Sequence, residues 1–315
     1  MNENRENQVH EKKNSDHLLD KIEGGKRDLE GWQHYLVSGI ALSASLFHLY
    51  TAYFGLLPAM YQRAIHWMFM GTIIFLLYPL SGKRPRKKID FWDWIFAGLL
   101  VAGCLNIIMN WEAMAMRAGA PIPSDIYMGG LLEVLVIEAT RRTVGWPLPI
   151  VAILSLCYAL FGPYLPGMFA HAGFPFSDLA SFEYLRTDGI FGVPLGVSAS
   201  FIFLFVLFGS ILNVSGAGQF FIDLALALTG KSRGGPAKAA VVSSALMGSV
   251  SGSSVANTVT TGSFTIPLMK SVGYPAHFAG AVEAASSTGG QIMPPVMGAA
   301  AFVMAQFLGI SYWTI

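Results

Sequence analysis

Long apolar runs recur along the first two thirds of the chain and constrain its fold more than any other feature. A bilayer core about 30 Å thick needs roughly 20 apolar helical residues, and six segments approach that length. Hydrophobic types make up 53% of the 315 residues and charged types only 12%, too apolar for a soluble domain. We therefore expect an all-α polytopic membrane protein whose transmembrane helices are Tyr35–Leu57, Ala64–Leu80, Phe91–Ile108, Ile126–Thr140, Trp146–Phe161 and Leu195–Val214.

The placement of charges predicts how these helices cross the lipid bilayer. Residues 1–33 are polar and lack the apolar core of a signal peptide, so they are expected to be a retained cytosolic tail. The basic run Lys83–Lys88 and the pair Arg141 and Arg142 follow the second and fourth spans, and short basic loops stay in the cytoplasm. Glu138 is expected to pair with one of these two arginines. The net charge of +1 gives no reason to expect nucleic acid as a partner.

A long stretch without charge predicts a different kind of element. No charged residue lies between Lys238 and Lys270, yet the basic residue at each end favours the cytoplasm, which a single straight span cannot satisfy. Its middle, Gly248–Thr258, is rich in glycine and serine. It divides the stretch into two helical arms of roughly 15 residues, each reaching about 22 Å. We therefore expect a re-entrant helical hairpin whose tip stops within the membrane.

A discontinuous helix is expected directly after the hairpin. Pro275 opens an apolar helix that is interrupted at Ser286–Pro295 and resumes to about Leu308. Thr288 is a candidate cap for the resumed half, and the pair Pro294-Pro295 suits its first helical turn. A second helix N-terminus is thus expected to point into the membrane interior.

These two breaks form a candidate binding site, because non-helical backbone at membrane depth must be buried in protein or line a wet cavity. Hydroxyls and carbonyls at the hairpin tip suit Na⁺, and the helix N-terminus near Ser254 favours a carboxylate. Glu283 precedes the second break, and both ion coupling and a structural hydrogen bond remain open for it. The alternative is that the small residues only let helices pack closely or form a linker.

Three segments have amino-acid sequences similar to those of a known family: Gly234–Lys238, Gly248–Tyr274 and Ala279–Phe302. They resemble the large permease (DctM-like) of tripartite ATP-independent periplasmic (TRAP) transporters, in the fused form associated with TAXI-type binding proteins. The resemblance implies three domains: the cytosolic tail 1–33, a DctQ-like small-subunit domain 34–142, and the amino-terminal half of the permease domain 143–315. Such cores contain two inverted repeats, and because this chain shows one hairpin, we expect it to be truncated.

The resemblance also implies a mechanism. It is a Na⁺-driven elevator in the bacterial inner membrane, with a cytoplasmic N-terminus, that takes a small carboxylate such as a C4-dicarboxylate from a periplasmic TAXI-type binding protein. Na⁺ as coupling ion is then the only cofactor, with Ser253, Asn257 and Thr288 as candidate ligands and Glu283 as a possible coupling acid. The full set expected to bind substrate or ion is Ser251, Gly252, Ser253, Ser254, Asn257, Thr258, Thr288, Gly289, Gly290 and Pro294.

Two other functions compete with a carrier. A membrane enzyme with Ser251 as nucleophile would need a nearby base, and the downstream sequence offers only His277 near a helix start, so no catalytic residue is assigned and no enzyme is expected. A channel or a non-transporting membrane scaffold is the stronger alternative, and saturable, ion-coupled uptake would separate it from a carrier.

Overall fold

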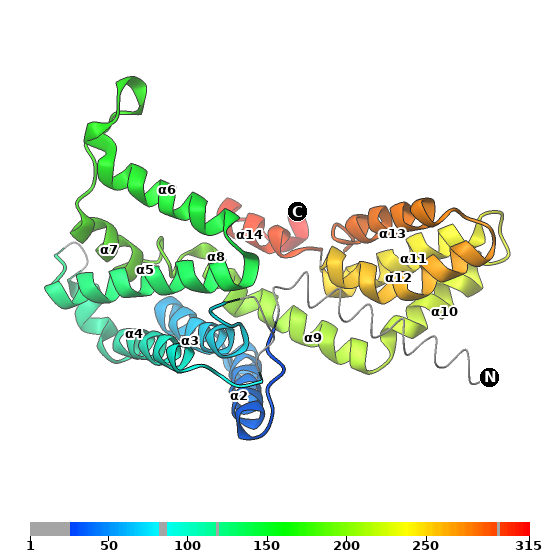
Figure 1. The fold of residues 1–315 in the computed structure, drawn as a ribbon, viewed down its shortest axis with the longest axis horizontal. Helices are drawn as coiled ribbons and strands as arrows, with labels where there is room; N and C mark the ends of the chain where they lie inside the picture. The colour runs from blue at the N-terminus through cyan, green and yellow to red at the C-terminus, as the bar shows by residue number, and fades with distance from the viewer. Residues whose placement is uncertain (1–25, 82–86, 118–119, 295–296) are drawn as a thin grey trace. The chain divides into compact units, whose positions relative to one another are not determined.

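The computed structural model describes residues 26–81, 87–117, 120–294 and 297–315, and every regular element in these ranges is a helix (Figure 1). The all-α prediction is therefore confirmed for these residues. Contacts divide the described chain into an amino-terminal unit, which ends at Ser200, and a carboxy-terminal unit, residues 201–315. Most of the predicted tail (1–25) and of the basic run (Lys83–Arg86) lies outside the described residues. The predicted domain boundary after Arg142 falls inside a helix and stays a prediction.

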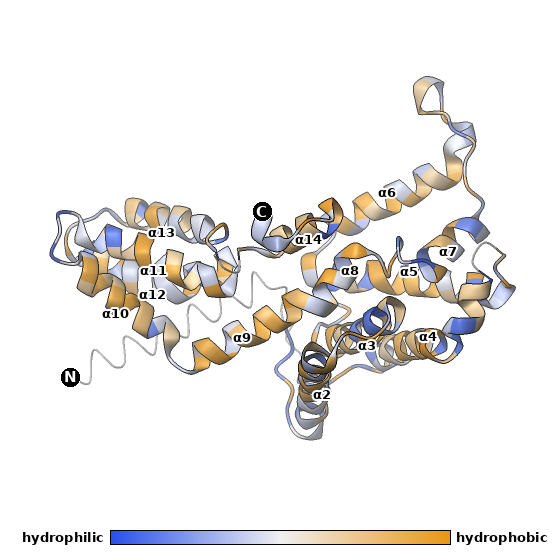
Figure 2. Ribbon diagram, turned by 180° about the vertical axis from the view of Figure 1, so that it is seen from behind, coloured by the Kyte–Doolittle hydropathy of each residue, from blue (hydrophilic) through white to orange (hydrophobic). Residues whose placement is uncertain are grey.

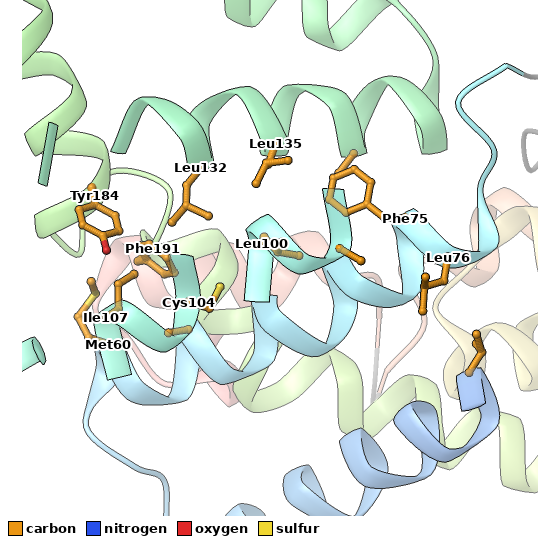
Figure 3. Close-up of a cluster of buried hydrophobic side chains, with 14 of the residues drawn as sticks. Met60, Phe75, Leu76, Leu100, Cys104, Ile107, Leu132, Leu135, Tyr184 and Phe191 are labelled. Carbon is orange, nitrogen blue, oxygen red and sulfur yellow. The ribbon is translucent and has the colours of Figure 1, made fainter. Parts of the chain in front are cut away.

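The amino-terminal unit is built around three long helices that pack on one another. Apolar residues at helical spacing give each of these helices a buried face. One of the helices buries Leu100, Cys104 and Ile107, and the buried side chains of all three helices meet in one cluster (Figure 3). The helices of this unit are α2 (Trp32–Phe54), α3 (Ala59–Leu77), α4 (Phe91–Met116), α5 (Pro123–Val144), α6 (Pro147–Phe161), α7 (Phe176–Leu185) and α8 (Val193–Val197), with 3-10 turns at Gly162–Tyr164 and Gly167–Phe169 and a π-helical turn beginning at Ser198.

A buried ion network joins α4 and α5 to the segment before α2. The carboxylate of Asp93 accepts hydrogen bonds from Arg27 and, at 2.6 Å, from Arg142, and all three side chains are fully buried. Arg142 also donates to Glu138 at 2.7 Å, and Arg141 donates to the same carboxylate at 2.7 Å. The predicted pairing of Glu138 with these arginines is confirmed, and it involves both of them.

Four helical segments of the described chain are long and apolar enough to cross a membrane: Trp32–Phe54, Phe91–Met116, Pro147–Tyr164 and Val193–Leu212. Hydrophobic residues dominate α6 and a later helix, α9 (Phe203–Val214), along their length (Figure 2). The second and fourth predicted spans are helices α3 and α5, but neither belongs to this set. Both carry polar or charged side chains that are used inside the unit, such as Arg142 on α5. The prediction of six spans is therefore not confirmed.

The carboxy-terminal unit contains six α-helices in its described residues: α9 (Phe203–Val214), α10 (Ala217–Thr229), α11 (Gly235–Ser251), α12 (Ser254–Ser271), α13 (Ala276–Gly290) and α14 (Ala299–Leu308), followed by a 3-10 turn at Tyr312–Thr314. Helices α11, α12 and α13 pack against one another in all three pairings, and α10 packs on α11 (Figure 1). Small buried residues such as Ala240, Ser244 and Gly248 line the contact face of α11, so the backbones approach closely.

Candidate functional site

Helices α11 and α12 form a hairpin whose turn consists of only two residues, Gly252 and Ser253. Gly252 ends α11 in the left-handed region at φ 62°, and its N–H donates to the Gly248 carbonyl at 3.0 Å. Glycine adopts this conformation without the steric cost that other residues meet. The Ser253 hydroxyl accepts a hydrogen bond from a backbone N–H of the first turn of α12 at 3.3 Å and caps that helix. The second arm begins at Ser254, as predicted.

The turn is much shorter than the predicted break at Gly248–Thr258, because the surrounding hydroxyls are satisfied within the helices. Ser249 donates to a carbonyl three residues back at 2.7 Å, and Thr258 donates to the Ser254 carbonyl at 2.8 Å. Ser251 differs from them: its hydroxyl oxygen is buried and has no hydrogen-bond partner among the described residues. A buried polar atom without a partner is uncommon, and an atom of a bound ligand would satisfy it.

The discontinuous helix is also present, with its break displaced from the predicted position. Helix α13 continues through Gly290, and α14 begins only at Ala299. Thr288 was predicted to cap the resumed half, and this is wrong, because it lies inside α13 and its hydroxyl donates to the Ala284 carbonyl at 2.8 Å. Pro294 lies in the break rather than in the first turn of α14, and Pro295 lies outside the described residues.

The hairpin tip lies against the break between α13 and α14. A Cβ atom added to Gly252 would lie 2.6 Å from the Met297 carbonyl oxygen, and one added to Gly298 would lie 3.7 Å from the Gly252 carbonyl oxygen. Met297 has φ 51°, a left-handed conformation that costs a non-glycine residue about 1 kcal/mol or more and that clusters at functional sites. The N-termini of α12 and α14 therefore open close together, each equivalent to roughly half a positive charge.

The three predicted Na⁺ ligands lie in different surroundings. Ser253 and Asn257 are one helical turn apart on α12, and Asn257 is fully buried, whereas Thr288 is exposed on α13. No hydrogen bond among the described residues joins Thr288 to either of the other two. Gly289 is likewise exposed. The assignment of individual Na⁺ ligands stays a prediction. The oxygen atoms that lie close together in the structure are those at the hairpin tip.

Asn257 and two glycines make the contact between hairpin and α13 very close. The Asn257 amide donates to the Ser244 carbonyl at 2.8 Å. A Cβ atom added to Gly290 would lie 2.8 Å from both groups of this hydrogen bond, and one added to Gly248 would lie 2.5 Å from the Gly290 backbone. Gly290, predicted to bind ligand, therefore has a packing role, because only a residue without a side chain fits there.

Glu283 is the centre of a buried polar cluster on three helices. Its carboxylate accepts hydrogen bonds from Ser244 on α11, from Thr261 and Thr265 on α12, and from Ser287 on α13. The bonds from both serines measure 3.1 Å. All five side chains are buried. The structural hydrogen bond, one of the two roles left open for Glu283, is thus present in a fourfold form that ties both arms of the hairpin to α13.

The four hydroxyl residues of this cluster were not predicted, although the sequence holds a signal for three of them, Thr261, Thr265 and Ser287. Ser253, Asn257, Thr261 and Thr265 recur every fourth residue, which places them on one face of α12, and Ser287 follows Glu283 at the same interval. Polar residues at that spacing in an otherwise apolar helix predict a polar stripe. The stripe leads from the hairpin tip to the Glu283 carboxylate.

Comparison with known proteins places the site within a described family. Residues 131–315 match the family of the DctM component of tripartite ATP-independent periplasmic transporters, and this is more than half of the chain. The 2,3-diketo-L-gulonate TRAP transporter large permease protein of Escherichia coli is 34% identical over 107 residues, which are 34% of this chain and 25% of that protein. No solved structure matched the chain.

The C4-dicarboxylate TRAP transporter large permease protein of Rhodobacter capsulatus is 37% identical over 91 residues, 29% of this chain and 21% of that protein. The chain thus spans about a quarter or less of the length of these curated relatives. The relatives are named as transporter permeases, which are not enzymes, in agreement with the sequence analysis.

Proposed function

This chain belongs to the family of DctM components of tripartite ATP-independent periplasmic transporters, and on that premise we propose that it forms part of a permease that takes up small organic acids. C4-dicarboxylates or related carboxylates are the proposed substrates, since one relative is named as a C4-dicarboxylate permease. The observation that carries the proposal is the contact between the hairpin tip at Gly252 and the break at Met297 and Gly298.

The chemistry of this contact suits a carboxylate. Two helix N-termini open there, and their unpaired N–H groups and dipoles favour an anion without the help of lysine or arginine. Ser253 already occupies part of the α12 terminus, and the buried hydroxyl of Ser251 lacks a partner, so both kinds of donor are present in one place. The proposed substrate site therefore lies at the tip.

Na⁺ is the proposed coupling ion. Carbonyl oxygens of Gly252 and Met297 lie at the tip beside hydroxyl oxygens, and hard oxygen ligands of this kind suit Na⁺. Glu283 is a second group open to coupling, because it lies at the end of the polar stripe that begins at Ser253. We propose that the hairpin is re-entrant and moves with α13 as one body in an elevator mechanism, which the close packing of Gly248 and Gly290 supports.

The proposed setting is the bacterial inner membrane. The chain crosses it several times with a cytoplasmic N-terminus, residues 34–142 act as a fused DctQ-like domain, and a periplasmic binding protein of the TAXI type delivers the substrate. The clustering of Arg141 and Arg142 at the end of α5 supports this orientation through the positive-inside rule.

Uptake into proteoliposomes tests the proposal. The full-length gene product is reconstituted with its binding protein, and uptake of labelled C4-dicarboxylate is measured with and without an inward Na⁺ gradient. Gly252→Ala places a Cβ 2.6 Å from the Met297 carbonyl, whereas Gly280→Ala adds the same atom in α13 with nothing within 4 Å. We expect saturable, Na⁺-dependent uptake that Gly252→Ala lowers at least about tenfold, the effect of a small displacement at a binding site, and that Gly280→Ala leaves unchanged.

Two results would contradict the proposal in different ways. Non-saturable uptake that ignores the Na⁺ gradient would favour a channel, and absence of uptake with every carboxylate would favour a scaffold. Coupled uptake that Gly252→Ala does not affect would leave the carrier function standing and move the site away from the tip.

A further inference from the structure

The loop that joins α6 to α7, residues 162–175, is unusually poor in charge. It contains no acidic side chain, no lysine and no arginine, and the nearest charged residues along the chain are Arg142 and Asp178. The loop also continues a candidate membrane span, because the apolar stretch that begins with α6 extends through the first 3-10 turn to Tyr164. It therefore starts where such a span meets the lipid headgroups.

Hydrogen bonds fold this loop back onto the end of α6. The N–H of Phe174 donates to the Ala159 carbonyl at 2.9 Å, and the N–H of His171 donates to the Gly162 carbonyl at 3.3 Å. Two 3-10 turns lie between these bonds, and Gly167 begins the second of them in the left-handed conformation at φ 60°. The segment is thus a closed loop with a defined backbone rather than an open linker.

The imidazole ring of His171 joins the two ends of the loop. Its Nδ1 accepts a hydrogen bond from the Gly173 N–H at 3.1 Å, so the ring proton is on Nε2, which donates to the Tyr158 carbonyl of α6 at 3.0 Å. The ring covers Gly162 so closely that a Cβ atom added there would lie 2.2 Å from it. One side chain therefore fixes the loop against the helix that precedes it.

The closed loop directs large apolar side chains outwards. Met168 is 90% exposed and Tyr164 is 84% exposed, and Phe169 and Phe174 are exposed as well. Figure 1 shows the loop standing clear of the neighbouring helices at the far end of α6. Several large apolar side chains exposed side by side are uncommon on a surface that faces water, and they mark a site of interaction.

Lipid fits this surface better than a protein partner does. A protein interface has a polar rim around its apolar centre, whereas the exposed side chains of the loop offer a single polar group, the Tyr164 hydroxyl. Aromatic rings are enriched where acyl chains meet headgroups. The loop also adjoins α6, a candidate span that is itself largely exposed, so the apolar surface continues from the span into the loop.

We propose that residues 162–175 form a membrane anchor that lies in the headgroup region of the bilayer, with Tyr164, Met168 and Phe169 directed towards the acyl chains. The anchor does not cross the bilayer, and its apolar side chains enter the boundary between headgroups and acyl chains to about 5–10 Å. It holds the end of α6 and the start of α7 at one bilayer surface. The anchor requires neither the substrate nor the coupling ion of the proposed function.

Spin labelling of the full-length gene product in phospholipid nanodiscs tests the anchor. The label is attached through Met168→Cys in a Cys157→Ala background, because Cys157 is exposed whereas Cys104 is buried. Relaxation of the label is measured with oxygen, which concentrates in lipid, and with a neutral nickel chelate, which stays in water. We expect the label at position 168 to respond several times more strongly to oxygen than to the chelate.

Two further labelling sites give the reference values. Leu154→Cys places the label on the exposed face of α6 and reports lipid, and Lys88→Cys places it on an exposed charged position and reports water. The ratio of the oxygen response to the chelate response at position 168 should lie closer to the ratio for Leu154→Cys than to the ratio for Lys88→Cys.

A variant of His171 tests whether the loop is held in one conformation. His171→Ala removes both side-chain hydrogen bonds that join the loop ends, so the spectrum of the label at position 168 should show faster motion. Ala170→Ser changes an exposed side chain of the same loop and is the control, with no change expected. An unchanged spectrum in His171→Ala would show that this ring does not fix the loop.

Two results would overturn the anchor itself. A label at position 168 that responds to the chelate as strongly as the label of Lys88→Cys would show that the loop lies in water, and a protein partner would then be the occupant of its apolar surface. A label shielded from both reagents would show that the loop is buried against protein. Neither measurement involves uptake, so failure of the anchor is distinct from failure of the proposed carrier function.

Discussion

The two units bury acidic side chains in opposite ways. In the amino-terminal unit, the Asp93 carboxylate lies between Arg27 and Arg142, and the three fully buried side chains form ion pairs. In the carboxy-terminal unit, Glu283 is just as buried but is bound by hydroxyl groups alone. One unit thus surrounds its acid with fixed positive charges, and the other surrounds it with uncharged hydroxyl groups.

This difference separates two tasks that a buried acid can perform. Ion pairs held by arginine are permanent under physiological conditions, because a guanidinium group does not lose its proton. Such a network fixes helices in one arrangement. Hydroxyl groups rotate and serve as donors or acceptors, so a cluster made of them can exchange its hydrogen bonds. The amino-terminal network therefore suits a rigid scaffold, and the Glu283 cluster holds its acid by contacts that can rearrange.

The largest effect is expected for Asp93→Asn. The substitution leaves the buried side chains of Arg27 and Arg142 without their shared anion, and breaking a buried pair in this way costs about 3–5 kcal/mol. Thermal unfolding of the purified protein in detergent measures the loss. Glu112→Gln, which removes an exposed acid from the same helix, is the control and should change little. A loss below about 1 kcal/mol, the range of exposed pairs, would show that the network does not hold the helices together.

A smaller loss is expected for Gly290→Ala, which tests close packing in the carboxy-terminal unit. The added Cβ would lie 2.8 Å from the Ser244 carbonyl and from the Asn257 amide. Overpacking of this kind costs about 1–3 kcal/mol. Gly289→Ala adds the same atom one residue earlier with nothing within 4 Å, and alanine is the better helix former there. Equal unfolding temperatures for the two variants would contradict the close approach of α13 to the hairpin.

Glu283→Gln is expected to reduce stability by no more than about 1.5 kcal/mol, the net value of one hydrogen bond. The glutamine oxygen still accepts from the serines, and its amide nitrogen donates to the Thr265 hydroxyl oxygen. The thermal unfolding experiment used for Asp93→Asn also measures this loss of stability, so the two variants compare the two units directly. A loss as large as that of Asp93→Asn would mean that the hydroxyl groups hold their acid as firmly as the arginines hold theirs, and the contrast between the units would fail.

Ser251→Ala should change stability least and in the opposite direction. The substitution removes a buried hydroxyl oxygen without a partner, so the protein is expected to gain up to about 1 kcal/mol while proteoliposome uptake falls. Ser249→Ala is matched to it, because that hydroxyl donates within α11, and it should leave uptake unchanged. If Ser251→Ala lowers stability and uptake equally, the hydroxyl has a structural partner and no role in binding.

The sequence predicts most of the carboxy-terminal architecture, because its signals are local. Lys238 and Lys270 around a charge-free stretch predict a hairpin, and the structure contains one with its second arm starting at Ser254. The predicted length of the turn is wrong. Glycine and serine favour helix breaks by propensity, but serine hydroxyls next to this turn form hydrogen bonds within their own helices. Thr288 is misplaced for the same reason, since its hydroxyl is satisfied four residues back inside α13.

The networks that join distant segments are harder to predict. Arg27 and Asp93 are 66 residues apart, and Arg142 lies 49 residues beyond Asp93, so no spacing rule connects them. Glu283 stands out because acids are rare in apolar helices. Its hydroxyl partners do not stand out, because serine and threonine in a helix rich in small residues resemble residues that only pack. Only their recurrence every fourth residue distinguishes them, and a single sequence gives that pattern little weight.

The order in which the Glu283 cluster is synthesised has a consequence for folding. Helices α11 and α12 are complete at Ser271, before Glu283 is made, so the hairpin can close while its acidic partner is still missing. During that interval, Thr261 and Thr265 can donate to the carbonyls one turn back, so neither hydroxyl is unsatisfied in the newly synthesised hairpin. The same two hydroxyl groups turn to the Glu283 carboxylate once α13 arrives during translation.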